Sequence, residues 1–498
     1  MPTAQEIHDA ALVPDMDGLV FCIGTFAKRV NFLAQQRRAL NLIWALHELN
    51  LLGKSPRAAV VGGGLAGVTA AGALMAFGVK VDLFEAGRRV LHLQRETAHR
   101  RAHPTINGWP HEQIRLDAEL PFFDWATGLC SEVAEEIAKE FEGMMKAEGN
   151  EIYERNEVQD IVSTGADVVR IIPEYPAKRE AFNLVIVTAG FGREVNGTPF
   201  RCESYWRGDN LEPERDDLND NFVVSGCGDG GLIDALRLLH LDFDKGRLAF
   251  SVARRLAGSP LAEAIKKAET IARSGGSLAD LAVAYEAAAQ QLGTRRQYAA
   301  IHRDLVRSAN KFKGVVYLGD HHLEKPYSLR AAPIHKLLVA HASKVMAKIS
   351  YNKSAVAETE KGEVQFAKRC LKPPPSTKVV VRHGAAPSLQ HVLPNAFEAL
   401  KTKQEALPDS FADPAWPASF DYPVPKALNA YDRGSRKFAW SRFRQAQRAL
   451  SEIFTDVSVQ PLPGRLTAQI NEALPADAPT SLFQLQIDYQ PVPESDAL

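Results

Sequence analysis

The chain has 498 residues, 45% of them hydrophobic, which is enough for two or three domains with large cores. The chain has 59 Lys and Arg against 60 Asp and Glu, so its charge is balanced. It also contains no apolar run of about 18 residues. These two features predict a protein that binds neither nucleic acid nor membrane. The five cysteines form no CxxC pair, which argues against a disulfide framework, a metal site or a redox-active dithiol and fits the cytoplasm.

Residues 1–56 are interpreted as an N-terminal packing segment. Within it, residues 37–49 place Leu40, Ile43 and Trp44 on one face of an expected helix. Residues 54–56 then form a turn into the first predicted strand.

The most informative stretch of the chain is residues 57–85. An apolar strand is followed by glycines at GxGxxG spacing, a helix of small residues, a second strand and a terminal acid, Glu85. The first glycine permits a tight turn, the second lets the backbone approach a pyrophosphate, and the third allows close helix packing. The predicted contacts of this turn are Gly62, Gly63, Gly64, Leu65, Ala66 and Gly67, with Glu85 meeting a ribose hydroxyl.

This stretch resembles the FAD-binding fingerprint of the two-dinucleotide-binding flavoproteins related to glutathione reductase. The resemblance implies FAD as the cofactor, whereas the spacing alone also allows NAD. It also implies that the basic segment after Glu85 returns past the pyrophosphate, so Ala86 and Arg95 are further candidate cofactor contacts. The loop at residues 103–110 contains two prolines and a glycine and presents His103, Asn107 and Trp109, which are candidate substrate contacts.

Residues 158–174 are expected to form short strands of a β-meander, and residues 182–187 a buried strand. Thr188, Ala189 and Gly190 follow that strand, where small residues let the backbone approach a cofactor. This end resembles the second flavin-contact motif of the same family, although the usual order there is Ala-Thr-Gly.

A second GxGxxG spacing occurs within residues 221–239, and its candidate contacts are Gly226, Gly228, Asp229 and Gly231. One interpretation is an NAD(P)H site; a second is a Gly-Asp motif whose carboxylate contacts the flavin ribityl chain; a third is a structural turn. The strand-like residues 240–243 follow so closely that they argue against a complete nucleotide-binding unit.

The expected fold class is α/β: a Rossmann-like FAD-binding domain, a second nucleotide-binding-like domain, a helical insertion and a mixed C-terminal region. The expected boundaries are 57–200 for the first part of the FAD domain, 201–350 for the second domain with its insertion near 250–312, 351–375 for a linker, and 376–498 for the C-terminal region that completes the fold. The last region includes a basic aromatic helix pattern at 435–454 and an alternating strand at 483–489. The insertion or this region could bind a protein partner.

The favoured function is an FAD-dependent oxidoreductase that uses NAD(P)H and acts on a small organic substrate, plausibly as a monooxygenase. Disulfide reduction is disfavoured because no cysteine lies between Glu85 and Cys130. The alternatives are an FAD-dependent amine or amino-acid oxidase and a non-catalytic nucleotide-binding sensor. No motif identifies a catalytic side chain, because the flavin itself performs the electron transfer.

Overall fold

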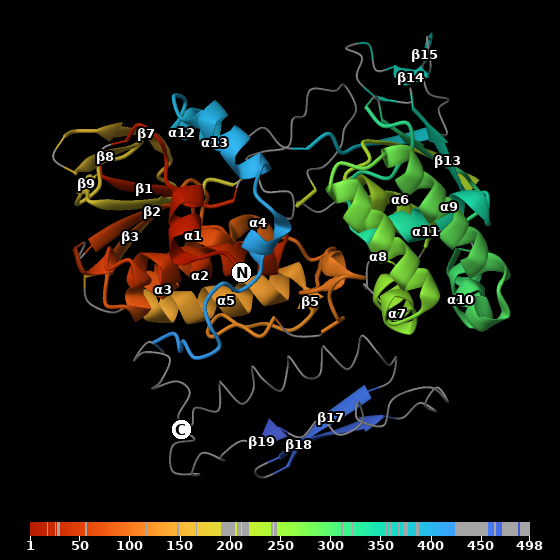
Figure 1. The fold of residues 1–498 in the computed structure, drawn as a ribbon, viewed down its shortest axis with the longest axis horizontal. Coiled ribbons are helices and arrows are strands. Elements are labelled where there is room, and N and C mark those ends of the chain that lie inside the picture. The colour runs from red at the N-terminus through yellow and green to blue at the C-terminus, as the bar shows by residue number, and fades with distance from the viewer. Residues whose placement is uncertain are drawn as a thin grey trace. The chain divides into compact units, whose positions relative to one another are not determined.

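The computed structural model describes residues 1–190 and 219–423, with 205–206, 211, 457–462, 465–470 and 487–488, apart from gaps at 17, 25, 27–29, 55–56, 116–117, 147–148, 166, 241–242, 244–246, 310–311, 321, 354–355, 358–360, 362, 367–368, 372–376 and 385–387. The chain divides into two compact units (Figure 1). Unit 1 comprises Met1–Ala98, Leu116–Gly192 and Pro387–Leu498, and unit 2 comprises His99–Arg115 and Arg193–Ala386.

Unit 1 is built around a five-stranded sheet in which all neighbouring strands are parallel. Its order is β1-β10-β2-β3-β6. The strands are β1 (Leu19–Cys22), β2 (Arg57–Val61), β3 (Lys80–Glu85), β6 (Glu151–Glu154) and β10 (Leu184–Val187). Because β2 and β10 are apolar and buried along nearly their whole length, they form the centre of this sheet.

The N-terminal residues do more than pack. Strand β1 pairs in parallel with β10, with Leu19 opposite Leu184 and Cys22 opposite Val187. Residues 1–56 therefore contribute the outermost strand beside β10, which corrects their interpretation as a packing segment only.

The helices of unit 1 pack closely because small residues line their contacts. A Cβ added at Gly72 of helix α3 would lie 2.4 Å from a ring carbon of Phe123, so that ring approaches the helix backbone. The helices are α1 (Ala4–Ala11), α2 (Phe32–Glu48), α3 (Leu65–Ala76), α4 (His92–Arg95), α5 (Cys130–Met145), α12 (Leu389–Val392) and α13 (Phe397–Glu405).

The remaining strands of unit 1 are β5 (Gly128–Leu129) and two antiparallel groups. The predicted meander is found as β7 (Val158–Ser163), β8 (Val169–Pro173) and β9 (Ala181–Phe182). Strands β17 (Val457–Leu462), β18 (Arg465–Ile470) and β19 (Ile487–Asp488) form the other group. The helix predicted at 435–454, and most of the strand predicted at 483–489, lie outside the described residues.

Unit 2 contains a second parallel sheet, of order β13-β12-β11-β16. Its strands are β11 (Asn221–Ser225), β12 (Val316–Gly319), β13 (Ile349–Asn352) and β16 (Thr377–Val381). The unit also contains β4 (Arg101–Ala102) and the antiparallel pair β14 (Val364–Phe366) and β15 (Arg369–Leu371).

Helix α6 (Asp229–Leu239) follows β11, and helix α11 (Pro333–Lys344) connects β12 to β13. The predicted insertion is helical: α7 (Arg247–Arg255), α8 (Pro260–Arg273), α9 (Leu278–Thr294) and α10 (Ala299–Ala309). Ser259 and Ser277 cap α8 and α9 by accepting hydrogen bonds from free amides of the first turn. The α/β class with parallel sheets is confirmed, and no helix among the described residues could cross a bilayer.

Candidate dinucleotide-binding sites

The first glycine turn joins β2 to α3 in unit 1. Gly62 has φ +104°, a value that L side chains rarely adopt, and its amide donates to the Phe84 carbonyl at 2.8 Å. A Cβ at Gly67 would lie 1.8 Å from the Gly62 carbonyl oxygen, so only glycine lets α3 start this close to β2. Around Gly64 nothing lies within 4 Å of such a Cβ, which leaves the space that a pyrophosphate needs.

Glu85 ends β3 beside this turn. Its Oε2 accepts from the Gly63 amide at 2.6 Å and its Oε1 from the Gly87 amide at 2.5 Å. Burial raises the pKa of the Glu85 carboxyl, although the two amide hydrogen bonds act in the opposite direction. The acid is therefore held against the glycine turn, while Ala86 beside it is exposed.

Thr188, which follows the neighbouring strand β10, contacts the first glycine turn. Its hydroxyl lies 2.9 Å from the Val61 carbonyl oxygen and 2.8 Å from that of Gly62, and its amide donates to Val61 at 2.8 Å. Ala189 is buried, and a Cβ at Gly190 would meet nothing within 4 Å. The structure thus brings the two motifs predicted for the first cofactor to one edge of the sheet.

The second glycine turn joins β11 to α6 and repeats this geometry. Gly226 has φ +112°, and its amide donates to the Gly319 carbonyl at 2.8 Å. A Cβ at Gly231 would lie 2.0 Å from the Gly226 carbonyl oxygen, and one at Gly228 would meet nothing within 4 Å. Each glycine of this motif thus has the same role as its counterpart in the first.

An acid from the neighbouring strand, which the sequence offers as a candidate flavin or ribose contact, also lies at the second turn. Asp320 follows β12, and its Oδ2 accepts from the Cys227 amide at 3.1 Å. The parallel neighbour of β11 is β12 and not the strand-like segment at 240–243, of which 241–242 lie outside the described residues; α6 ends at Leu239. The apolar run before Gly319-Asp320 was the available signal for this acid.

Asp229 begins helix α6 and is turned toward the start of α11. Its Oδ1 lies 2.7 Å from His335 Nδ1 and accepts from the Ala332 amide at 2.9 Å, and its Oδ2 accepts from Asn107 at 3.3 Å. Burial acts to raise the pKa of Asp229, but His335 and these hydrogen bonds outweigh it and lower the pKa. Of the three predicted substrate residues, Asn107 is therefore at the second turn.

The other predicted contacts have packing roles in the structure. Arg95 lies on α4 and binds two acids of α5, Glu135 at 2.8 Å and Glu142 at 3.1 Å, rather than the turn at Gly62. Trp109 is 1% exposed within the hydrophobic core of unit 2. His103 is half-buried, and its Nδ1 accepts from two backbone amides of its own loop. Their positions give no support to phosphate or substrate contacts.

A charged cluster links α6 to the end of β16. Asp234 binds Arg100 at 2.5 Å, Arg237 at 3.1 Å and Arg382 at 2.6 Å, and all four side chains are buried. Burial acts to raise the pKa of Asp234, but the arginines lower it. A Cβ at Gly226 would lie 2.2 Å from the Arg382 carbonyl oxygen, so this cluster connects directly to the second turn.

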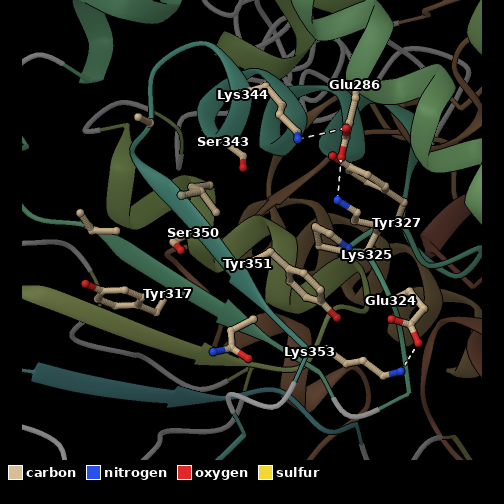
Figure 2. Close-up of a pocket in the computed structure, with 15 residues that line it drawn as sticks. Glu286, Tyr317, Glu324, Lys325, Tyr327, Ser343, Lys344, Ser350, Tyr351 and Lys353 are labelled. Atoms are coloured by element: carbon tan, nitrogen blue, oxygen red, sulfur yellow. Dashed lines mark hydrogen bonds and ion pairs between the residues drawn. The ribbon is translucent and has the colours of Figure 1, made fainter. Parts of the chain in front are cut away.

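A cavity of about 800 Å³ lies beside β13 in unit 2 (Figure 2). Glu286 on its wall binds Lys325 at 3.1 Å and Lys344 at 3.0 Å. The Tyr351 hydroxyl in the same wall donates to the carbonyls of Leu323 and Asp320. Tyr351 thus connects the cavity wall to Asp320, whose side chain accepts from the second glycine turn.

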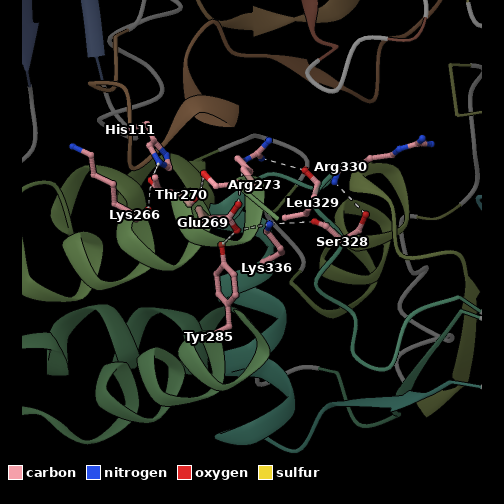
Figure 3. Close-up of polar contacts among 11 residues, drawn as sticks. His111, Lys266, Glu269, Thr270, Arg273, Tyr285, Ser328, Leu329, Arg330 and Lys336 are labelled. Carbon is pink, nitrogen blue, oxygen red and sulfur yellow. Dashed lines mark hydrogen bonds and ion pairs between the residues drawn. The ribbon is translucent and has the colours of Figure 1, made fainter. Parts of the chain in front are cut away.

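A second polar cluster lies inside the helical insertion (Figure 3). Glu269 of α8 forms an ion pair with Lys336 of α11 and accepts from the Tyr285 hydroxyl of α9 at 2.6 Å. All three residues are fully buried, and Lys336 also donates to the Ser328 carbonyl at 3.1 Å. Burial lowers the pKa of Lys336, although Glu269 acts against it. The cluster ties three helices together.

Residues 57–102 match the pyridine nucleotide-disulphide oxidoreductase family. A search of curated protein sequences finds no match to the chain. Among solved structures, the chain is similar to a water-forming NADH oxidase from Lactobacillus brevis bound to NADH, at 15% identity and a TM-score of 0.21. That match covers 36% of this chain and 28% of the oxidase, so this chain spans under a third of the oxidase.

A thioredoxin reductase from Lactococcus lactis is 15% identical, with a TM-score of 0.30, over 66% of this chain and 77% of that one. OTEMO in complex with FAD and NADP is 10% identical, with a TM-score of 0.37, over 67% of this chain and 72% of that one. At such values these structures carry no argument about activity.

The family match covers the first glycine turn, Glu85 and the basic segment. The matching family consists of FAD-dependent oxidoreductases. Over these residues, the match supports the predicted class, an FAD-dependent oxidoreductase of unassigned subclass.

Proposed function

We propose that the chain binds FAD at the first glycine turn and NAD(P)H at the second, and that it passes electrons to a small organic substrate or to oxygen, as a monooxygenase does. The observation that carries this proposal is the duplicated turn: two parallel sheets each present an open central glycine and an acid from the neighbouring strand. Both turns have the geometry of a dinucleotide site.

The residues of the first turn fit FAD. The space at Gly64 and the amides at the start of α3 suit a pyrophosphate, and Glu85 lies where a ribose would be bound. Thr188 fixes the turn, and Gly190 leaves room on the adjacent strand. Bound FAD would supply the two-electron chemistry, and these residues would bind and orient it.

The second turn fits a nicotinamide dinucleotide better than a ribityl contact. The Asp229 carboxylate is already bound to His335, Ala332 and Asn107, so both of its oxygens are engaged by protein groups. A nucleotide-binding unit needs a neighbouring parallel strand that ends in an acid. Here β12 is that strand and Asp320 is that acid.

The sequence disfavours a disulfide as the electron acceptor. No cysteine lies between Glu85 and Cys130, where a disulfide reductase would carry its dithiol. Of the cysteines whose side chains are described, Cys22, Cys130 and Cys227 are all buried. We therefore infer an organic substrate or oxygen as the acceptor.

The test combines a visible spectrum with anaerobic mixing of the purified full chain with NADH or NADPH. We expect flavin bands that bleach on mixing, and Gly228→Ala should keep the bands but bleach more slowly. Gly143→Ala is the matched control, because Gly143 lies in α5 and its added Cβ would also meet nothing within 4 Å.

Three results would contradict the proposal. A colourless protein would show that the chain binds no FAD. Bleaching of the flavin by an amine alone would indicate an oxidase. Tight nucleotide binding without reduction by any donor indicates a sensor.

A further inference from the structure

The acid at the second turn is held in a defined position. Asp320 follows β12, which is parallel to β11 with Ser225 opposite Gly319. Its Oδ2 accepts from the Cys227 amide at 3.1 Å, and its Oδ1 accepts from the His322 amide at 2.8 Å. Two backbone amides from different segments therefore fix the carboxylate beside the GxG turn.

The acid at the first turn, Glu85, is held in the same way, so the role of Asp320 can be inferred by comparison with it. There Glu85 also accepts from the residue between the first two glycines, Gly63, and from an amide two residues after itself, Gly87. In a parallel βαβ unit, an acid at this place meets the hydroxyls of the adenosine ribose. Asp320 is thus the ribose acid of the second site.

An acid at this place discriminates between the two nicotinamide cofactors. A carboxylate accepts hydrogen bonds from free ribose hydroxyls. A 2′-phosphate would instead bring negative charge against the carboxylate and could donate no comparable hydrogen bond. The discrimination follows from charge repulsion together with the lost hydrogen bond.

Two lysines line the same cavity wall as Tyr351, whose hydroxyl donates to the Asp320 carbonyl, and both are already paired with acids. Lys325 binds Glu286 at 3.1 Å, and Lys353 forms an ion pair with Glu324. Each of these two lysines therefore already shares its charge with a carboxylate.

Resting on the proposed function, we propose that the second site takes NADH rather than NADPH and that Asp320 is the residue that selects it. The preference lies in binding of the adenosine ribose, remote from the reacting ring. It therefore applies equally to the oxidised and reduced cofactors.

The experiment measures dissociation constants of NAD⁺, NADP⁺, ADP-ribose and 2′-phospho-ADP-ribose for the full chain with its flavin bound. We expect at least about 30-fold tighter binding of the forms without the 2′-phosphate, from hydrogen bonds to a charged acceptor. Asp320→Asn keeps an acceptor for the Cys227 amide and should reduce this ratio about tenfold.

Glu324→Gln is the matched control, since this exposed acid lies four residues further along the loop, and it should leave the ratio unchanged. Equal or tighter binding of the 2′-phosphorylated forms by the unaltered chain overturns the inference but keeps the two-nucleotide proposal. Absence of binding by all four compounds overturns both the NADH preference and the two-nucleotide proposal. An unchanged ratio in folded Asp320→Asn overturns the role of Asp320.

Discussion

The two glycine turns follow the same backbone path, but their acids reach them by different routes. Glu85 is 22 residues from Gly63, whose amide it binds, whereas Asp320 is 93 residues from Cys227. In unit 1 the single helix α3 connects the two strands, and in unit 2 helices α6 to α10 do so. The place of the acid depends on the neighbouring parallel strand and not on the length of the intervening chain.

The turns also differ in what holds them. In unit 1 the neutral hydroxyl of Thr188 contacts the turn. In unit 2 the Arg382 amide donates to Ser225 at 2.7 Å, and its guanidinium binds Asp234 of α6. The turn of unit 2 is therefore coupled to buried charges. We expect the stability of unit 2 to depend more strongly on pH and on the removal of a charge than the stability of unit 1.

Acidification tests this difference with the largest expected effect. Burial lowers the pKa of His103 and His240 to about 3 and that of His341 to about 4, and all three lie in unit 2. Below pH about 6.5 the unfolded chain binds protons that the folded chain does not, so stability is full above that pH and is lost as the pH falls toward 4. Each histidine contributes up to about 1.4 kcal/mol per pH unit.

Hydrogen exchange at pH 7 and pH 5, corrected for intrinsic rates, measures this loss. Amides of α6, α10 and α11 should lose protection relative to those of β2 and β3. Equal changes in both units would contradict the assignment of acid sensitivity to unit 2.

Removal of one buried charge has the next largest expected effect. Lys336→Met leaves the buried Glu269 with Arg273, 3.4 Å away, as its other ion-pair partner, so we expect a cost of about 3 kcal/mol, the lower end for breaking a buried pair. Protection of α8, α9 and α11 against hydrogen exchange should fall accordingly. Adding Glu269→Leu should recover part of the loss, and a further loss in the double variant would show that the pair is not coupled as described.

The third glycines provide a matched pair across the two units. Gly67→Ala and Gly231→Ala each place a Cβ within 2.0 Å of a carbonyl oxygen, so each should lower the free energy of unfolding by about 1–3 kcal/mol. Urea unfolding measures this change. Gly64→Ala and Gly228→Ala should keep the stability and lose nucleotide affinity. Loss of stability in these two variants with unchanged nucleotide affinity would contradict the roles assigned to the glycines.

The smallest expected effect concerns the hydroxyl at the first turn. Thr188→Val removes the contacts with Val61 and Gly62 at constant shape, which should cost about 1 kcal/mol and weaken retention of the flavin. Thr164→Val removes an exposed hydroxyl that also donates to a carbonyl and serves as the control. If both variants release flavin equally, Thr188 has no special role.

The sequence predicted those parts of the sites that are local in the chain. The turn from Gly62 to Glu85 was predictable because strand, glycines, helix and acid follow one another without interruption. The strand before Thr188 was predictable because its four apolar residues are buried and flanked by small residues. Both lie at the edge where they were expected.

The long-range partners were harder to predict. Asp320 comes from a strand that a helical insertion separates from its turn, so the usual spacing of about 20 residues does not apply. Arg95 could not be assigned because the acids that bind it lie on α5, a helix distant in sequence. The loop at residues 103–110 was expected to present its single His and single Trp, yet Trp109 lies in the core of unit 2.

The place of β1 has a consequence for how the chain is synthesised. β1 is made long before its partner in the sheet, β10, and before Thr188, whose hydroxyl contacts the first turn. Such a long-range parallel pairing forms slowly and late, because the loop must close before the contact stabilises anything. The first turn is therefore completed only once Thr188 has been made, and a cofactor that binds this turn would stabilise the folded unit only from then on.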